Sequence, residues 1–430
     1  MQTQDGDPVV IIGAGLAGLC CARALEAAGR PAVVFEAADD VGGRVRTDKV
    51  DGFLLDRGFQ VFLDSYPEAG RVLDLEALQL CPFEPGALTR RSDVGGWLPL
   101  SDPFRRPGRA LATALSPAAT FRDKWLIARL RRDVIRGDAE QLLREDEKRS
   151  TLDFLRAYGF SERIIETFFR PFFGGVFLDR SLSTSARLFR WLFRLFAKGN
   201  ACLPAAGMES IPRQLAVRLK NAELRMSTRV ASVDAKAVTL EGGETIDAEA
   251  VVVATDGETA AALLGERLAM EPRPMRTTTT FYFAADAPAT HDNILLLSGE
   301  DSRACGPVNT VAQLSVAAPS YAPEGQTLLS ASVVDADEPD EAKLLDAVRA
   351  GLSHMLGGDY GTGLRHLRTY TIERALPSQP PPVLADPHKP AKLAEGLFVC
   401  GDHRDTASIN GAMLSGRRAA EALIASHPAL

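Results

Sequence analysis

The sequence predicts a mixed fold of the α/β and α+β classes, in which a parallel sheet with a β-hairpin excursion is interleaved with a second domain of mixed sheet and helices. A chain of 430 residues exceeds the size at which one hydrophobic core usually keeps growing, so we expect two or three joined domains. A strand, helix, strand pattern opens the chain, and strand-like runs return near its middle and its C-terminal end. Between them lies a long stretch of helical segments broken by prolines.

The composition is that of an ordinary globular protein, with 46% hydrophobic and 24% charged residues. The net charge of −7 argues against a nucleic-acid partner. Residues 104–136 nonetheless carry nine Arg or Lys against two Asp, which is typical of a solvated helix face or of an anionic or membrane-facing surface. The polar first residues lack the pattern of a signal peptide, and no run of 18 apolar residues occurs, so we expect a cytoplasmic protein.

The six cysteines and six histidines predict neither a disulfide framework nor a metal site. No C-x-x-C spacing occurs, and the histidines show no paired ligand spacing. No G-x-S-x-G pattern of a serine hydrolase is present. The chemistry must therefore come from another kind of site.

The first 36 residues predict a βαβ unit. A short apolar run, Val9–Ile12, ends at a glycine, an Ala- and Leu-rich helical stretch follows from Leu16 to Ala28, and a second apolar run, Ala32–Phe35, ends on an acid. The three loop glycines provide a tight turn, room for a pyrophosphate and close packing of helix on sheet, and the helix N-terminus favours phosphate. The acid lies eighteen residues after the last of these glycines, where it can accept hydrogen bonds from a ribose. The residues that we expect to contact a dinucleotide here are Gly13, Gly15, Leu16, Ala17, Gly18, Glu36 and Ala37.

A glycine-rich segment follows, Val41-Gly42-Gly43-Arg44, and with it the sequence resembles the flavin amine oxidase superfamily, which includes protoporphyrinogen oxidases and phytoene desaturases. The resemblance implies that Gly42, Gly43 and Arg44 contact the pyrophosphate of FAD. The physical logic is independent of the resemblance, because paired glycines let the backbone approach an anion and a guanidinium offers a planar fork to phosphate oxygens. The first loop alone does not distinguish NAD from FAD.

The segment Gly396-Leu397-Phe398-Val399-Cys400-Gly401-Asp402 resembles the second flavin motif of this superfamily. The resemblance implies that Asp402 binds a ribityl hydroxyl and that the helix opening near Asn410 aims its free N–H groups at the pyrimidine edge of the flavin. It also implies an adenine contact at Val230. The cofactor contacts that the resemblance assigns in these regions are Val230, Ala254, Thr255, Gly401, Asp402, Ser408, Ile409, Asn410, Gly411 and Ala412.

These motifs predict how the chain divides. A discontinuous, Rossmann-type FAD-binding domain, similar to that of glutathione reductase, comprises residues 1–70, 205–257 and 366–430. A substrate-binding domain comprises residues 71–204 and 258–365, and its helical part spans 100–198.

The spacing of the last motif indicates a branch of the superfamily. Gly401 and Gly416 lie fifteen positions apart, similar to the layout in protoporphyrinogen oxidases and phytoene desaturases, and residues 403–409 contain no aromatic side chain. Amine oxidases commonly place a lysine near the flavin on a strand of the substrate domain, but the candidate strand, 277–283, has none. The chain therefore resembles the desaturase and protoporphyrinogen oxidase branch more closely than the amine oxidases.

The expected reaction is removal of a hydride from a C–C or C–N bond of a largely hydrophobic small molecule, by a dehydrogenase, desaturase or oxidase. Two alternatives stay open: a flavin amine oxidase that produces hydrogen peroxide, and a structural or sensing flavoprotein without turnover. Candidate catalytic residues are Arg57 and Gln60, where the superfamily brings the chain back past the flavin, and His403, which follows the ribityl-binding aspartate. The electron acceptor, whether oxygen, a quinone or a protein, and the oligomeric state are not indicated.

A basic stripe marks the helical segment 187–198. Arg187, Arg190, Arg194 and Lys198 follow at intervals of 3, 4 and 4 on an otherwise aromatic and aliphatic helix. Such a helix can lie on a membrane surface and give peripheral contact, or it can belong to the core and present a solvated arginine face.

Overall fold

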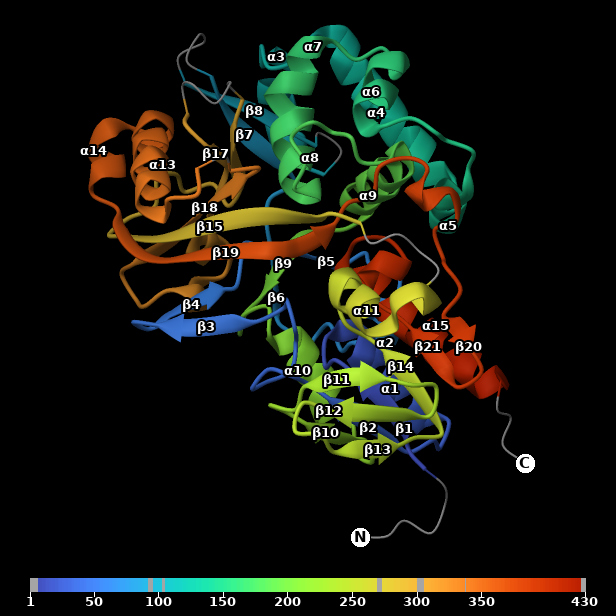
Figure 1. The fold of residues 1–430 in the computed structure, drawn as a ribbon. Helices are drawn as coiled ribbons and strands as arrows, with labels where there is room; N and C mark the ends of the chain where they lie inside the picture. The colour runs from blue at the N-terminus through green and yellow to red at the C-terminus, as the bar shows by residue number, and fades with distance from the viewer. Residues whose placement is uncertain are drawn as a thin grey trace.

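The computed structural model describes residues 7–91, 96–102, 105–268, 273–299, 305–336 and 338–426. Two large sheets lie at different levels of the molecule, and a group of helices caps the side away from the N-terminus (Figure 1). Residues 1–6, within the region that lacks a signal-peptide pattern, lie outside the described residues.

The first large sheet has six strands and collects them from three separate parts of the chain. The strands in spatial order are β10 (Glu223–Arg225), β2 (Ala32–Phe35), β1 (Val9–Ile12), β14 (Ala250–Val253), β21 (Leu397–Val399) and β20 (Lys392–Ala394). The first five run parallel, and β20 pairs antiparallel with β21 at the edge. This confirms the predicted α/β fold.

Both faces of the six-stranded sheet are covered, which explains why its strands are continuous apolar runs. Val9 and Ile11 pack in the core that contains α1 (Leu16–Ala27) and α15 (Ile409–Ser426). Val10 and Ile12 point the other way, because successive strand residues alternate, and they pack in the core of a small antiparallel sheet. That sheet consists of β11 (Val230–Val233), β12 (Ala237–Leu240) and β13 (Thr245–Asp247), so the predicted hairpin excursion has three strands.

The second large sheet has seven strands. In spatial order they are β19 (Arg365–Pro377), β15 (Met275–Ala285), β18 (Thr327–Val334), β17 (Val308–Gln313), β16 (Leu295–Ser298), β7 (Gly86–Arg91) and β8 (Gly96–Ser101). Phe281 and Phe283 of β15 face the core built on α13 (Glu341–Leu356), with α14 (Gly358–Thr362) beside it, whereas Tyr282 faces the core shared with the first sheet. The sequence assigned 366–377 to the FAD-binding domain. These residues instead form β19, because they pair along the free edge of β15.

The helical part lies at the upper right in Figure 1, beside strands β7 and β8 of the seven-stranded sheet. Its helices are α3 (Ala110–Leu115), α4 (Phe121–Arg136), α5 (Ala139–Arg144), α6 (Thr151–Tyr158), α7 (Glu162–Ile164), α8 (Arg170–Phe177) and α9 (Ala186–Lys198), with a π-helical turn at Ile165–Phe169. At its centre, the ring of Phe189 meets the rings of Phe169 and Phe173 edge to face, and these two rings are stacked on each other. The helices therefore share one aromatic core.

Short elements join the two large sheets. They are the hairpin β3 (Thr47–Val50) and β4 (Phe53–Asp56), the small sheet β5 (Phe62–Leu63), β9 (Ala201–Pro204) and β6 (Leu80–Pro82), and the helices α2 (Ala69–Val72), α10 (Ser210–Val217), α11 (Gly257–Leu264) and α12 (Leu314–Ala317). Asp56 links β4 to β15. Its backbone oxygen accepts from the Tyr282 hydroxyl at 2.8 Å, and its carboxylate accepts from the Tyr321 hydroxyl at 3.0 Å. Burial raises the pKa of Asp56 to about 6.

The basic stripe of α9 does not form a surface. Arg187 and Arg194 are buried. The Arg187 guanidinium donates to the backbone oxygens of Glu147 at 2.9 Å and Leu384 at 2.8 Å, and Arg194 donates to the backbone oxygens of two residues near the C-terminal end of α4. Of the two interpretations of 187–198, the core helix fits the buried apolar residues of α9, but Arg187 and Arg194 face neither a membrane nor solvent, because their guanidiniums bind carbonyl groups inside the protein. Within the described residues, no helix has the length and apolar character needed to cross a bilayer.

Candidate active site

The loop between β1 and α1 forms an open cradle at the N-terminus of α1. Gly13 has φ +107°, and a Cβ on Gly18 would lie 1.9 Å from the Gly13 oxygen, so close packing requires glycine at both positions. A Cβ on Gly15 would meet nothing within 4 Å, and no side chain caps α1 there. The first N–H groups of α1, from Leu16 and Ala17 onward, therefore face free space where an anion can bind.

Glu36 lies at the end of β2, beside this cradle. Its carboxylate accepts hydrogen bonds from the backbone N–H groups of Ala14 at 2.7 Å and of Ala38 at 2.8 Å, so the turn through Ala37 holds it in place. The backbone oxygen of Glu36 accepts from Thr228, which leads into β11 at the buried Val230. Val230 thus follows two residues after a direct backbone contact with Glu36. The structure therefore brings these two residues, both predicted at the adenosine end, close together in space.

The glycine pair of the second segment packs against the first loop. Gly42 donates to the backbone oxygen of Ala14 at 2.9 Å and forms a bridge with Gly15, and Gly42 and Gly43 have φ of +113° and +58°. Positive φ values of this size favour glycine. The backbone of this segment therefore lies directly against the cradle.

Arg44 extends from this turn to the C-terminal motif. Its guanidinium donates to both carboxylate oxygens of Asp402 at 2.8 Å and to the backbone oxygen of Ala375 at 2.9 Å. Burial disfavours the charged guanidinium, but the contacts with Asp402 prevail and raise the pKa of Arg44. Two residues 358 positions apart thus form one fork-to-fork ion pair.

The carboxyl ends of β14 and β21 complete this edge of the sheet. Ala254 continues β14 and donates to the backbone oxygen of Ile12 at 2.9 Å, with Thr255 after it, and Gly401 follows β21 with φ +142°. In open parallel sheets, ligands bind outside the carboxyl ends of the strands. The predicted cofactor residues therefore converge where this topology places a binding site.

The N-terminus of α15 is held tightly from several sides. Ser408 accepts from the Gly411 N–H through its hydroxyl oxygen and from the Ala412 N–H through its backbone oxygen, both at 3.0 Å. The side-chain oxygen of Asn410 accepts from the Glu68 N–H at 2.9 Å. The N–H groups of Ile409 and Asn410, in the first helical turn, have no acceptor within the helix itself.

The segment after β4 joins the cofactor motifs to the seven-stranded sheet. Arg57 forms an ion pair with Asp48 at 2.9 Å, and that pair raises the pKa of the guanidinium. Gln60 donates to the backbone oxygen of Arg44 at 2.8 Å, and the N–H of Phe59 donates to the Thr280 hydroxyl at 3.2 Å. Arg57 and Gln60 therefore lie on a segment that contacts both the glycine turn and β15, and a role near the substrate stays a prediction.

His403 occupies a different environment. Its side chain is 5% exposed, and both ring nitrogens are buried without a hydrogen-bond partner. A Cβ on Gly401 would lie 2.6 Å from the ring, and one on Gly257 would lie 3.3 Å from it. Burial lowers the pKa of His403 to about 4, so the imidazole is neutral at physiological pH.

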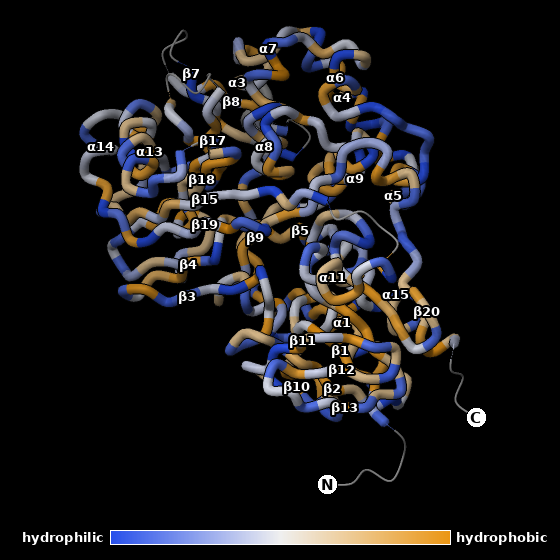
Figure 2. Tube along the Cα trace, viewed as in Figure 1, coloured by the Kyte–Doolittle hydropathy of each residue, from blue (hydrophilic) through white to orange (hydrophobic). Residues whose placement is uncertain are grey.

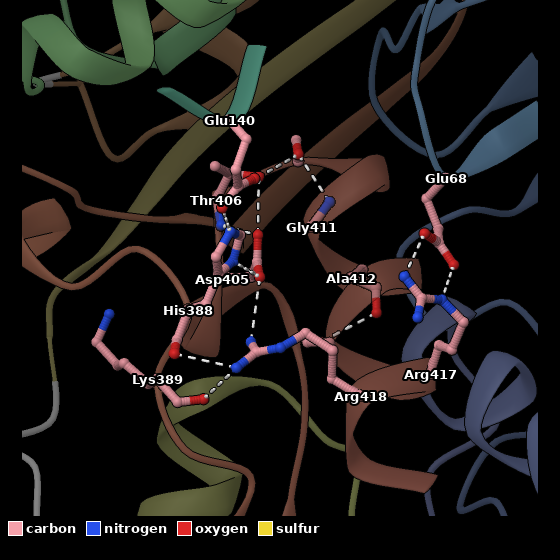
Figure 3. Close-up of polar contacts among 12 residues, drawn as sticks. Glu68, Glu140, His388, Lys389, Asp405, Thr406, Gly411, Ala412, Arg417 and Arg418 are labelled. Atoms are coloured by element: carbon pink, nitrogen blue, oxygen red, sulfur yellow. Dashed lines mark hydrogen bonds and ion pairs between the residues drawn. The ribbon is translucent and has the colours of Figure 1, made fainter. Parts of the chain in front are cut away.

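Sequence reasoning missed a charged cluster beside this site. His388 contacts the carboxylate of Asp405 through Nδ1 at 2.6 Å and that of Glu140 through Nε2 at 2.5 Å (Figure 3). These two hydrogen bonds raise the pKa of His388 to about 9, against the effect of burial. The cluster borders a cavity of about 320 Å³ that also touches Trp191 and Asn410. Its three members come from distant parts of the chain, so no spacing in the sequence could have revealed it.

Comparison with known proteins places these motifs in a family. Residues 16–424 match the family described as flavin containing amine oxidoreductase. Protoporphyrinogen oxidase 2 of Arabidopsis thaliana is 26% identical over 178 residues, which are 41% of this chain and 33% of the relative. Putrescine oxidase of Kocuria rosea is 56% identical over 52 residues, which are 12% of this chain and 11% of the relative. The matched stretches thus span a third or less of these relatives.

A solved structure shows the same fold over nearly the whole chain. It is an oxidoreductase from Methanosarcina mazei, with a TM-score of 0.74 and 19% sequence identity. The alignment covers 96% of this chain and 100% of that one. The arrangement of two large sheets and a helical part is therefore shared across the full length.

Proposed function

Because the chain belongs to the family of flavin-containing amine oxidoreductases, it is a flavin-dependent oxidoreductase, and we propose that its flavin is FAD and its substrate a largely hydrophobic small molecule. The proposed reaction removes a hydride from a C–C or C–N bond, as in the desaturase and protoporphyrinogen oxidase branch. The observation that best supports the FAD site is the ion pair between Arg44 and Asp402, because it joins the two flavin motifs at one end of the cradle.

The residues of the cradle fit an FAD pyrophosphate. The open space at Gly15, the uncapped N-terminus of α1 and the guanidinium of Arg44 offer N–H donors and positive charge to phosphate oxygens. The carboxylate of Glu36, already held by two backbone N–H groups, has lone pairs left for ribose hydroxyls. Asp402 is the acceptor proposed for the ribityl chain.

The flavin ring would lie between the N-terminus of α15 and the segment through Arg57 and Gln60. A flavin bound there supplies a hydride acceptor. The N–H groups of Ile409 and Asn410 would then be fixed donors to the ring, and donors at a helix N-terminus favour negative charge. The side chain of Gln60 donates to the backbone oxygen of Arg44, which fixes its position relative to the cofactor motifs.

The substrate would lie against this segment and β15, which are joined directly to each other. The strand presents Thr280 toward the segment, through the hydrogen bond from Phe59, and Tyr282 toward Asp56. No lysine occurs in any strand of the seven-stranded sheet, all of which lie within the described residues. This supports a substrate other than an amine and a reaction in which β15 contributes shape and water exclusion rather than a base.

The test for FAD uses Gly15→Val. Gly15 has φ −72° and ψ 179°, which any residue can adopt, and open space surrounds its Cβ position, so the variant should fold as stably as the wild type without flavin. A valine there would displace a phosphate, and losing charge-assisted hydrogen bonds should weaken FAD binding about 10- to 100-fold. Gly70→Val in α2, whose Cβ position is equally open, is the matched control.

The measurement is titration of the apoprotein with FAD, FMN and riboflavin, followed by flavin absorbance and fluorescence. We expect the wild type to bind FAD tightly and FMN and riboflavin weakly. The affinity for FAD should fall in Gly15→Val and stay unchanged in Gly70→Val. Equal affinity for FMN would contradict the pyrophosphate assignment, because FMN lacks the pyrophosphate and adenosine.

The substrate class is tested by anaerobic bleaching of the purified holoprotein with polyenes, terpenoids, porphyrinogens and amines. Amine oxidation is the second candidate, favoured by the short stretch that is 56% identical to putrescine oxidase. It predicts bleaching by amines and release of hydrogen peroxide in air. Bleaching by an apolar, nitrogen-free compound would establish the desaturase-like reaction, and a flavin that no candidate reduces would favour a structural or sensing role.

A further inference from the structure

Helix α4 presents an exposed face that combines aromatic and basic side chains. Phe121 is 80% exposed and Trp125 is 61% exposed, and both belong to the four large exposed hydrophobic side chains of the described residues. Leu115, 71% exposed, lies beside them, since Lys124 of α4 donates to the backbone oxygens of Ala114 and Ser116. Three apolar side chains are therefore gathered at one place on the surface.

Basic residues continue the same face. Arg129, Arg132 and Arg136 are exposed and follow Phe121 and Trp125 at intervals of four, four, three and four, which keeps all five side chains on one side of a helix. Together with Arg131 they line a shallow hollow of about 470 Å³ next to Trp125. The Arg129 guanidinium lies 5.8 Å from the centre of the Trp125 ring. The face thus places an aromatic anchor directly beside a cluster of cations.

The opposite face of α4 fixes this orientation. Leu126, Leu130 and Val134 are buried in the protein core. The N-terminus has a full capping box, and the Asp123 carboxylate also accepts from the Ser161 N–H at 2.8 Å. The exposed aromatic rings are therefore held outward by a well-anchored helix.

Within the exposed face, the acidic charge is small. Asp133 contacts Arg132 at 3.3 Å and Arg129 at 3.7 Å. Ion pairs between exposed side chains contribute little, so phosphate groups can compete for these arginines. A water-exposed tryptophan and phenylalanine beside several arginines match the chemistry of a bilayer surface, where rings enter the headgroup region and cations bind anionic lipids.

We propose that the face of α4 formed by Phe121, Trp125, Arg129, Arg132 and Arg136, with Leu115, is a docking surface for an anionic phospholipid bilayer. It lies in the helical part, on the side of the molecule away from the six-stranded sheet (Figures 1 and 2). The surface is separate from the proposed flavin site and does not depend on the substrate. Its three arginines are part of the local positive charge at 104–136.

The test is binding of the holoprotein to vesicles of phosphatidylcholine, alone or mixed with phosphatidylglycerol. Binding is expected only to the mixed vesicles and should weaken as salt screens the arginines. Each arginine near an anionic surface contributes about fivefold, so Arg129→Gln/Arg132→Gln/Arg136→Gln should bind on the order of 100-fold more weakly. The matched control replaces three exposed arginines of the dinucleotide-binding part, Arg213→Gln/Arg218→Gln/Arg229→Gln, and should bind as the wild type does.

Tryptophan fluorescence tests the apolar anchor. The chain has three tryptophans, and Trp125 is the exposed one, since Trp191 is buried and Trp97 is partly buried. Mixed vesicles should shift the emission to the blue, and brominated lipids should quench it. Trp125→Phe should keep the binding and lose both signals, whereas Phe121→Ser/Trp125→Ser should lose the binding, and Val217→Ser, an exposed apolar residue elsewhere, should lose neither.

Three results would overturn the proposal. The first is no binding to the mixed vesicles at low salt. The second is equal binding to both kinds of vesicle or by the arginine variant, since either would remove the role of the cations. The third is a dimer in solution that Phe121→Ser/Trp125→Ser dissociates, because the face would then be covered by a second copy of the chain.

Discussion

Replacing His388 by glutamine should remove a pH-dependent part of the stability. His388 lies between the carboxylates of Asp405 and Glu140, which belong to the C-terminal motif region and to α5 (Figure 3). Arg418 also approaches the Asp405 carboxylate, at 3.5 Å, and donates to the His388 backbone oxygen at 3.0 Å. The imidazolium is thus a cation that ties the helical part to the flavin-binding part.

The magnitude follows from the pKa. A rise from 6.5 to about 9 in the folded state corresponds to about 3 kcal/mol of stabilisation for the protonated form. This stabilisation is fully present below pH 6.5. Between pH 6.5 and 9 the folded protein holds one proton more than the unfolded chain, so the free energy of unfolding falls as pH rises, and above about pH 9 the contribution is lost.

The assay is urea unfolding of the holoprotein at fixed excess flavin, from pH 6 to 9.5. The wild type should lose about 3 kcal/mol more than His388→Gln across this range. His366→Gln is the control, because burial lowers the pKa of His366 and moves its own effect below pH 6.5. Hydrogen–deuterium exchange at the imidazole C2 position, read by mass spectrometry, gives the pKa of His388 directly. Parallel stability curves for wild type and His388→Gln, or a measured pKa near 6.5, would refute the reasoning.

Three further predictions concern single side chains. Gly416→Ala should destabilise the protein by about 1 to 3 kcal/mol and lower its flavin content, because the new Cβ would lie 2.0 Å from the backbone oxygen of Ala17. Unfolding and flavin absorbance measure these two effects. Gly70→Ala, with open space around its Cβ, should show neither. Burial raises the pKa of Asp56 to about 6, so the wild type loses stability as that carboxyl ionises between pH 4 and 6. Asp56→Asn should remove this contribution from the pH dependence of thermal unfolding. An unchanged slope would contradict the assignment. Arg44→Lys should weaken FAD binding about tenfold in the titration described above, because a lysine cannot form the fork-to-fork pair; unchanged affinity would exclude Arg44 from the cofactor site.

The local signals of the part that contains the six-stranded sheet could be predicted because each depends on short-range geometry. The apolar runs of β1 and β14 are continuous since both faces of their sheet are buried. Gly18 must be glycine because its Cβ position lies against the loop only five residues earlier. The joining of Arg44 to Asp402 could be expected only through the family resemblance, since no local rule links residues so far apart.

The incorrect expectations came from partners that are distant in sequence. The spacing of Arg187 and Arg194 correctly placed them on one side of α9, but a helical period cannot tell whether the facing surface is water or the carbonyl end of another helix. The strand-like pattern of residues 366–377 is compatible with either large sheet. The free edge of β15, with which they pair, places them in the seven-stranded sheet. His388 gave no signal because its two carboxylates lie 17 and 248 positions away.

The order in which the six-stranded sheet collects its strands has a consequence for biosynthesis. β21 and α15 are translated long after β1 and α1, yet β21 pairs with β14 and α15 packs on α1 through the contact of Gly416 with Ala17. Until then, the part of α1 that faces α15 has no cover, and Arg44 lacks the carboxylate of Asp402. Until Asp402 and α15 have been synthesised, the proposed FAD site is therefore incomplete, and a nascent chain arrested before residue 400 should bind no flavin.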